Sequence, residues 1–152
     1  MRHRLTLIAA LLLLPWLAAT SARAVDLEPL EIAGRAGAHS FQVEVVTTPD
    51  EQARGLMFRK QLLPGRGMLF DFHSSREITM WMRNTYVPLD MIFIRADGRI
   101  HRIAENTEPL SERIIPSEGP VRAVLEVVAG TASKLGIAAG DRVVHPVFGT
   151  RP

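Results

Sequence analysis

The chain has 152 residues, of which 47% are hydrophobic and 22% charged, and it contains no cysteine. Disulfides, a thiol nucleophile, thiolate metal ligands and a lipid-modified amino-terminal cysteine are therefore excluded. The 18 Lys and Arg residues nearly balance the 16 Asp and Glu residues. Because no basic run or aromatic–basic interleaving occurs, the sequence lacks the electrostatic footprint of nucleic-acid binding.

Residues 1–24 have the three parts of a secretory signal peptide. Arg2-His3-Arg4 is a basic start, an apolar run covers 5–19, and Ala22-Arg23-Ala24 is a small-residue cleavage pattern. The run is shorter than the about 20 residues that span a membrane, although an uncleaved anchor is the alternative. We expect cleavage after Ala24 and a mature chain, 25–152, in the periplasm or outside the cell. No later apolar run is long enough for an integral membrane segment.

The mature chain is expected to form one β-rich domain that begins with a loosely attached lead-in, residues 25–37. Residues 41–46 alternate apolar and polar side chains, as in a half-buried strand. Thr48, Pro49 and Glu51 then match the start of a helix with a capping box. Gly55 limits that helix to a short one.

The remaining chain reads as short strands separated by turns. Asp97-Gly98 lies between two apolar runs and predicts a hairpin. Residues 105–120 contain three prolines and are expected to form a long surface loop, and 131–135 a helical turn closed by Gly136. The predicted strands cover residues 41–46, 68–72, 78–82, 89–95, 99–104, 121–128 and 142–148. The expected fold class is mainly β (β-rich α+β), a compact single-domain β-barrel or strongly bent sheet with one or two short helices.

The segment 55–98 holds every methionine of the expected mature chain and Trp81, its one tryptophan. Several unusual short sequence motifs occur here in one order at fixed spacing, and others follow near residue 125. They are Gly55-Leu56-Met57-Phe58-Arg59, Gly67-Met68-Leu69-Phe70, Met80-Trp81-Met82-Arg83-Asn84-Thr85, Pro88-Leu89-Asp90, and Val124-Leu125-Glu126 with Ala129-Gly130. These motifs resemble the domain of unknown function 192 family of small bacterial and archaeal proteins. The resemblance implies a compact, mainly β fold and supplies no activity, substrate or cofactor.

The connection between two predicted strands carries most of the candidate binding residues. One strand ends near Met82 and Pro88 leads into the next, so side chains at both ends should border one concave surface. We expect Trp81 to form a cleft wall, although it and the methionines could instead be core and Asn84 and Thr85 could serve only their own turn. The full set of ligand-binding candidates is Arg59, Trp81, Arg83, Asn84, Thr85, Asp90 and Glu126.

Two of these candidates are carboxylates inside apolar strands. An unpaired buried charge is costly, so Asp90 is expected at the rim or paired with Arg59 or Arg83. Alternation places Glu126 opposite Leu125 and Val127, a position that can face solvent.

Three classes of function follow. The first is a binding module for an unknown small molecule or peptide, with no cofactor, no nucleic acid and a cleft around Trp81. The second is a Cu(I) protein that uses Met80, Met82 and His73, because thioethers select soft metals. The third is a hydrolase or lyase that uses Asp90 and Glu126, with His73 as a possible third group. The chain has no G-x-S-x-G, P-loop or H-E-x-x-H motif, so whether it is an enzyme is left open, with binding favoured.

Overall fold

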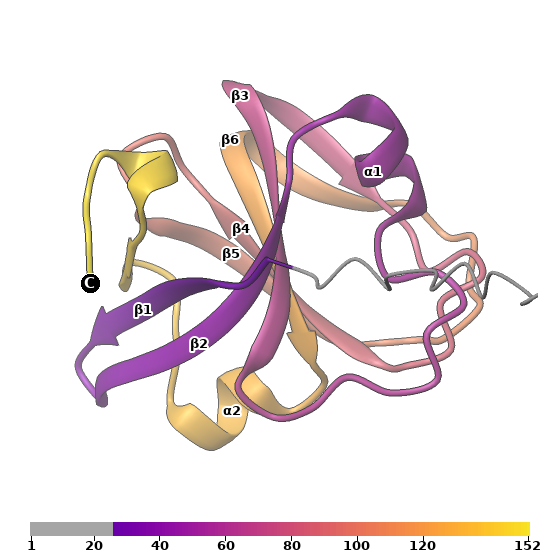
Figure 1. Ribbon diagram of the computed structural model, residues 1–152, viewed down its shortest axis with the longest axis horizontal. Coiled ribbons are helices and arrows are strands. Elements are labelled where there is room, and N and C mark those ends of the chain that lie inside the picture. The colour runs from indigo at the N-terminus through magenta and orange to yellow at the C-terminus, as the bar shows by residue number, and fades with distance from the viewer. Residues whose placement is uncertain (1–25) are drawn as a thin grey trace, which may run out of the picture.

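The computed structural model describes residues 26–152, which form one seven-stranded sheet with two short helices (Figure 1). The strand order is β5-β4-β6-β3-β2-β1-β7, and adjacent strands are antiparallel except for the parallel pair β2–β3. The elements are β1 (Glu28–Gly34), β2 (Gly37–Val46), α1 (Pro49–Arg54), β3 (Arg66–Met80), β4 (Leu89–Ile94), β5 (Ile100–Thr107), β6 (Ile115–Val128), α2 (Thr131–Leu135), β7 (Arg142–Val144) and a 3₁₀ turn, η1 (Pro146–Phe148).

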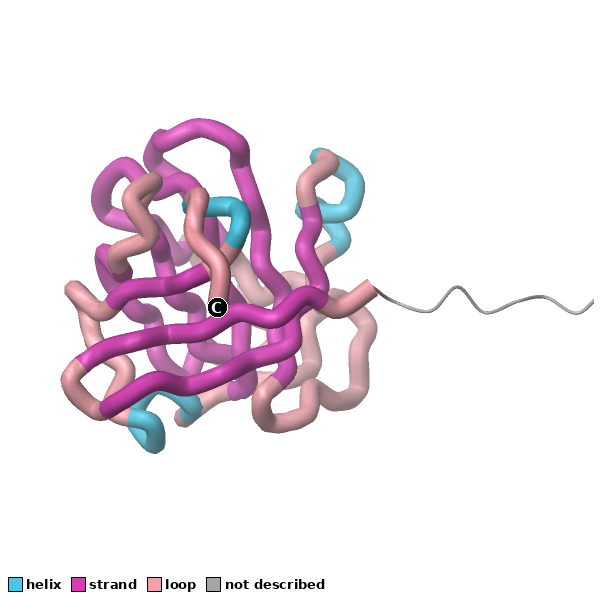
Figure 2. Tube along the Cα trace, turned by 60° about the vertical axis from the view of Figure 1, so that its left-hand side comes forward, coloured by secondary structure: helices cyan, strands magenta, loops and turns pink. Residues whose placement is uncertain are grey.

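The sheet bends until its two ends nearly meet, which gives a half-barrel (Figure 2). Strand β7 pairs with β1 and also touches the turn between β4 and β5. The Val143 N–H donates to the Gly98 carbonyl at 2.8 Å, and the Ile100 N–H donates to the Asp141 carbonyl at 2.9 Å. The prediction of a mainly β fold built on a strongly bent sheet is confirmed.

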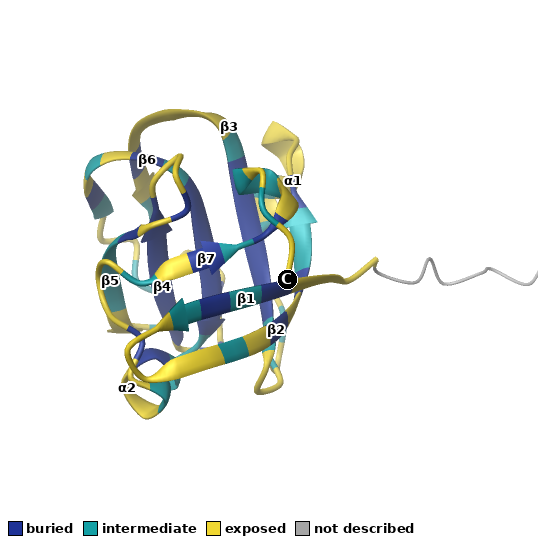
Figure 3. Cartoon of the chain, turned by 90° about the vertical axis from the view of Figure 1, so that its left-hand side faces the viewer, coloured by how far each residue is buried: buried dark blue, intermediate teal, exposed yellow. Residues whose placement is uncertain are grey.

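The central strands are buried on both faces over residues 67–71 of β3, 123–127 of β6 and 89–94 of β4 (Figure 3). Alternate side chains, among them Leu69, Leu125 and Ile92, join the cluster that includes residues of β1, β7 and α2. The intervening side chains, among them Phe70 and Phe93, join a second cluster with the loops that follow α1 and β3. We call these the inner and the outer core, and the candidate site lies against the outer core.

Several sequence-predicted features are present. Thr48 and Glu51 form the capping box of α1, and Pro49 is its first residue. The β4–β5 hairpin turns at Gly98 with φ 83°, and α2 ends at Gly136 with φ 66°. In each case short-range chemistry decides the structure, because a cap or a positive φ depends on neighbouring residues only.

Four boundaries differ from the prediction. Within the expected lead-in 25–37, the described residues are not loosely attached, because β1 lies between β2 and β7 with Leu30 fully buried. The predicted strands 68–72 and 78–82 are not separate, because residues 68–72 and 78–80 both belong to β3, which ends at Met80. This strand continues through an irregularity in its pairing with β6 between Asp71 and Arg76. The expected 105–120 loop is shortened by β5, which extends to Thr107, and by β6, which begins at Ile115. The predicted last strand ends at Val144, before Pro146.

None of the helices in the described part of the chain is long and apolar enough to cross a membrane. The predicted signal peptide, 1–24, lies outside the described residues.

Candidate functional site

Helix α1 and the segment after it are held against the outer face of β3. The side-chain amide of Gln52 donates to the backbone carbonyl of Asp71 at 2.7 Å. Gly55 ends the helix with φ 46°, and a Cβ built there would lie only 3.0 Å from the Phe70 ring. Glycine is required here twice, for its positive φ and for this close approach. Leu56 then enters the outer core and Met57 turns toward the sheet.

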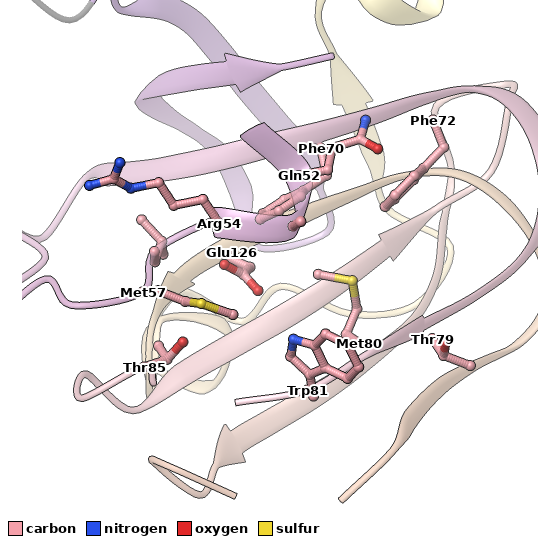
Figure 4. A pocket seen from close by; sticks show the side chains of 13 residues that line it. Gln52, Arg54, Met57, Phe70, Phe72, Thr79, Met80, Trp81, Thr85 and Glu126 are labelled. Atoms are coloured by element: carbon pink, nitrogen blue, oxygen red, sulfur yellow. The ribbon is translucent and has the colours of Figure 1, made fainter. Parts of the chain in front are cut away.

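A pocket of about 180 Å³ lies between α1 and the outer face of β3 and β6 (Figure 4). Its walls are mostly apolar, with Trp81 at the mouth. The side chains that line it come from Gln52, Ala53, Arg54, Leu56, Met57, Phe70, Phe72, Thr79, Met80, Trp81, Thr85 and Glu126, with the backbone of Gly55. An apolar cavity of about 150 Å³ can hold benzene, so this pocket has room for one ring or a short aliphatic chain.

Glu126 is the acid of this pocket. It is 4% exposed, and its cross-strand neighbours are Met68 on β3 and Met91 on β4, both buried. Within residues 26–152, no hydrogen bond or ion pair reaches its carboxyl group. Burial disfavours the charged form and raises the pKa of Glu126 to about 8, so the group is mainly protonated at neutral pH.

Two other polar side chains in the pocket already donate hydrogen bonds to backbone carbonyls. The Thr85 hydroxyl donates to the Arg83 carbonyl at 3.2 Å, and the Gln52 amide nitrogen serves the Asp71 carbonyl. The side chains that keep a donor free are Arg54, Thr79 and Trp81, all of them exposed. Apart from the O–H of the protonated Glu126, the buried part of the pocket therefore presents acceptors, while the other free donors lie at the mouth.

The structure brings three of the seven candidate residues together. Trp81, Thr85 and Glu126 line the pocket, and Trp81 is 42% exposed. Arg83 and Asn84 lie close by in sequence but do not line it. Arg83 stacks 4.9 Å from the Trp81 ring centre and pairs with Glu112, and the Asn84 amide lies 3.9 Å from the Met57 sulfur.

Asp90 is not part of this site. Its neighbour Met91 is opposite Glu126 in the ladder, so Asp90 itself points to the inner face. It is fully buried, and its two oxygens accept the N–H groups of Asn106 and Ala132 at 2.9 Å each. The expected pairing with an arginine was wrong, because backbone donors satisfy this carboxylate. The Asp90–Glu126 pair considered for a hydrolase points to opposite faces of the sheet.

Arg59 also lies outside the pocket, where its guanidinium forms a two-pronged ion pair with the carboxylate of Glu44 on β2.

The prediction that Glu126 can face solvent was wrong. Alternation does place Glu126 opposite Leu125 and Val127, but the face it reaches is the outer core. A half-buried sheet was assumed, whereas this one is covered on both sides.

The three residues of the copper alternative are not gathered in the pocket. Met80 lines it, Met82 is fully buried with its sulfur 3.2 Å from the Thr107 hydroxyl, and the His73 ring lies 3.1 Å from the Thr47 carbonyl. Across residues 26–152 no group of three His, Cys, Asp or Glu side chains is arranged to hold a metal ion. Both methionines pack with the outer core.

Sequence reasoning missed most of the pocket wall, namely Gln52, Arg54, Met57, Phe70 and Phe72. Met57 and Phe70 do belong to the unusual motifs of segment 55–98, which was the available signal. The pocket forms because α1 packs over β3. This is a long-range contact that the short motifs do not predict.

The fold and the pocket define a small half-barrel domain with a single acid in an apolar recess. Residues 31–145 match the family DUF192, described as "Uncharacterized ACR, COG1430", and the chain belongs to this family. No curated protein matches it. One similar solved structure, from Sinorhizobium meliloti 1021, is of a protein provisionally assigned as a transcription regulator. It has 46% identity and a TM-score of 0.78, covering 80% of this chain and 95% of that one. Another, a protein of unknown function from Novosphingobium aromaticivorans DSM 12444, has 42% identity and a TM-score of 0.79, covering 82% and 89%.

Proposed function

We propose that this protein is an exported binding module whose pocket takes in a compact, mainly apolar group that carries a polar head. The observation that supports this best is Glu126, a buried carboxyl group that no described residue contacts through a hydrogen bond or ion pair. Buried polar groups are almost always satisfied, so one that faces a cavity without a partner points to a ligand.

Binding accounts for the pocket better than catalysis does. General acid–base chemistry on a bound substrate usually needs a second group, a nucleophile or an orienting partner, within hydrogen-bond reach. Glu126 is the one titratable acid among the lining side chains, no histidine joins it, and the Thr85 hydroxyl is already engaged with a carbonyl. Asp90, the other acid of the hydrolase hypothesis, faces the inner core.

The surface around the mouth supports a peptide as one source of the bound group. Tyr86, five residues after Trp81, is also exposed and meets the exposed Phe58 edge-on at a centroid distance of 6.4 Å. Exposed aromatic side chains are typical of contact surfaces for other molecules.

Export is the second part of the proposal and rests on residues 1–24. The basic start, the apolar run and the Ala22-Arg23-Ala24 pattern together support a cleaved signal peptide. The intact mass of the protein recovered from the periplasm should correspond to a chain that begins at Val25. A mass that still includes residues 1–24 would contradict cleavage.

The provisional regulator assignment of the Sinorhizobium meliloti protein is not carried over to this chain. Without residues 1–24 the expected mature chain has one more acid than base, with no basic run to meet a phosphate backbone.

The binding proposal is tested by ligand-detected and protein-detected NMR with a library of small amphiphilic fragments. We expect fragments that shift the Trp81 indole and Met57 methyl signals of the wild type, and whose binding is lost in Trp81→Ala. For fragments small enough to lie within the pocket, Tyr86→Ala is the matched control, because Tyr86 is an exposed aromatic side chain that does not line the pocket. Equal loss in both variants, or shifts only outside the pocket, would refute the site.

A further inference from the structure

The buried end of the pocket is poor in donors, and this limits what can bind there. Glu126 offers acceptor oxygens when ionised, and the donors of Thr85 and Gln52 are turned to backbone carbonyls. When Glu126 is protonated, its O–H is the one free donor at this end, and when it is ionised there is none. A group that brings its own donors satisfies the acceptor oxygens in both forms, and a positively charged donor is also attracted by the ionised form.

The walls favour a cation over a neutral donor. The aromatic side chains of Phe70, Phe72 and Trp81 and the thioether side chains of Met57 and Met80 line the recess. Aromatic faces carry partial negative charge and attract ammonium groups, and thioethers are soft and polarisable. Arg76 lies 5.2 Å from the Phe72 ring centre and Arg83 lies 4.9 Å from the Trp81 ring centre, but neither arginine lines the pocket. Arg54 does line it, and in Figure 4 its guanidinium points away from Glu126. No described cation therefore pairs with Glu126.

We propose, resting on the function proposed above, that the polar head of the bound group is an alkylammonium ion whose chain packs on the methionines and aromatic rings while its nitrogen contacts Glu126. The free donors at the mouth, Arg54 among them, suit acceptor groups farther along the same molecule. A lysine side chain and a free aliphatic amine share this chemistry.

Such binding is coupled to a proton. Because the free carboxyl group is protonated below about pH 8, binding of an ammonium ion must release that proton, and affinity rises with pH until Glu126 is ionised. Amines of this kind keep their own charge to about pH 10, so the rise reports Glu126.

Glu126 is the one carboxyl group that lines the pocket, so we assign the expected pH dependence of binding to it. The charged or titratable side chains on the elements packed around Glu126 are Asp50, Glu51 and Arg54 on α1, His39 and Glu44 on β2, Arg66, Asp71, His73, Arg76 and Glu77 on β3, Asp90 on β4, and Glu118 and Arg122 on β6. Glu44 and Asp71 are each paired with an arginine, and Asp71 alternates to the other side of β3 from Phe70. Of these groups only Arg54 lines the pocket.

The test uses n-butylammonium, with n-butanol and n-butyramide as neutral counterparts, and follows the Trp81 indole and the Met57 and Met80 methyl signals by NMR. The affinity for n-butylammonium should rise about tenfold per pH unit from pH 6 to 8 and level off by pH 9. Affinity for n-butanol should change less than about twofold below pH 8. In Glu126→Gln, which keeps the shape of the side chain, the rise should vanish.

Two results would overturn the inference, and they are distinguishable. If the neutral probes bind at the pocket signals while n-butylammonium does not, or binds with no pH dependence, the head is not an ammonium and the proposed binding function stands. If no probe and no library fragment reaches these signals, the binding function falls as well.

A second arm separates the two sources of the ammonium group. A hexapeptide with one lysine is compared with the same peptide carrying norleucine, and with n-butylammonium. Binding at least about tenfold tighter than n-butylammonium, lost on replacement by norleucine, would support a peptide lysine. Equal binding of the peptide and the amine would support a free amine.

Discussion

Asp90 and Glu126 are both buried carboxyl groups on adjacent, hydrogen-bonded strands, yet their surroundings are opposite. Asp90 points into the inner core and accepts two backbone N–H groups, from the start of α2 and from the end of β5. Glu126 points into the outer core, between two methionines, and receives no such bond from the described chain. Asp90 links β4 to β5 and α2 through hydrogen bonds, whereas Glu126 faces only the pocket.

The difference teaches that burial of an acid does not by itself mark a site. Asp71 makes the same point: burial would raise its pKa, but hydrogen bonds from Arg122 and the His73 N–H outweigh burial, and the pKa is lowered. Fully satisfied carboxylates stabilise the fold. The unsatisfied one lowers stability, and a protein that keeps it has a use for it.

The largest expected effect is the pH dependence of stability that Glu126 imposes. Folding raises the pKa of this group from 4.5 to about 8, so its favourable contribution is complete below about pH 4.5 and is lost as the pH rises to about 8. Glu126→Gln is uncharged throughout. The free energy of unfolding of the variant minus that of the wild type should therefore increase by about 5 kcal/mol between pH 4.5 and 8 and then stay constant. Urea denaturation at each pH measures this difference.

Asp71→Asn gives the opposite trend and serves as the control. A carboxyl group with a lowered pKa stabilises the fold above its ordinary value of about 3.9 and loses that contribution as the pH falls. A constant offset between Glu126→Gln and wild type at all pH values would mean that the folded protein already solvates Glu126.

The next effect is the loss of the Asp90 bonds. Asp90→Ala leaves the N–H groups of Asn106 and Ala132 without an acceptor and should lower the free energy of unfolding by about 2–4 kcal/mol. Amide hydrogen exchange should speed up at these two positions first. Asp90→Asn, which keeps one acceptor oxygen, should lose about half as much, and a neutral Asp90→Ala would show that the comparison with Glu126 is mistaken.

The smallest effect concerns Arg83, which stacks on Trp81 without lining the pocket. Arg83 and Glu112 are both largely exposed, so a double-mutant cycle of the two alanine variants should give a coupling below about 0.5 kcal/mol. Fragment binding should be unchanged within about twofold in Arg83→Ala. A large loss of binding would return Arg83 to the list of ligand contacts.

The predictable parts of the fold were those that depend on near neighbours. The capping box of α1, the Gly98 hairpin and the Gly136 helix end each follow from a few adjacent side chains. The continuity of β3 was not predictable, because residues 73–77 are exposed and polar and carry no strand alternation. The strand resumes because Arg76 and Glu77 pair with Val121 and Pro120 of β6 after the irregularity, which is a long-range contact.

The site was partly predictable for the same reason. Trp81 and Thr85 lie in the strand connection that the sequence singled out, and both line the pocket. Asp90 lies at the end of that connection too, but alternation from Met91 turns it to the other face. Glu126 comes from β6 and meets Trp81 only because β3 and β6 pair and α1 covers them, so sequence order gave no reason to prefer it over Asp90.

The short strand β7 has a consequence for the order in which the domain folds. Its three residues pair with β1, which lies more than a hundred residues earlier in the chain, and they also touch the β4–β5 turn. Contacts of such sequence separation form late, because a long loop must close before they contribute. A chain still being synthesised has β1 and the hairpin in place but lacks the strand between them. Closure of the half-barrel must therefore wait until residues 142–144 have been made.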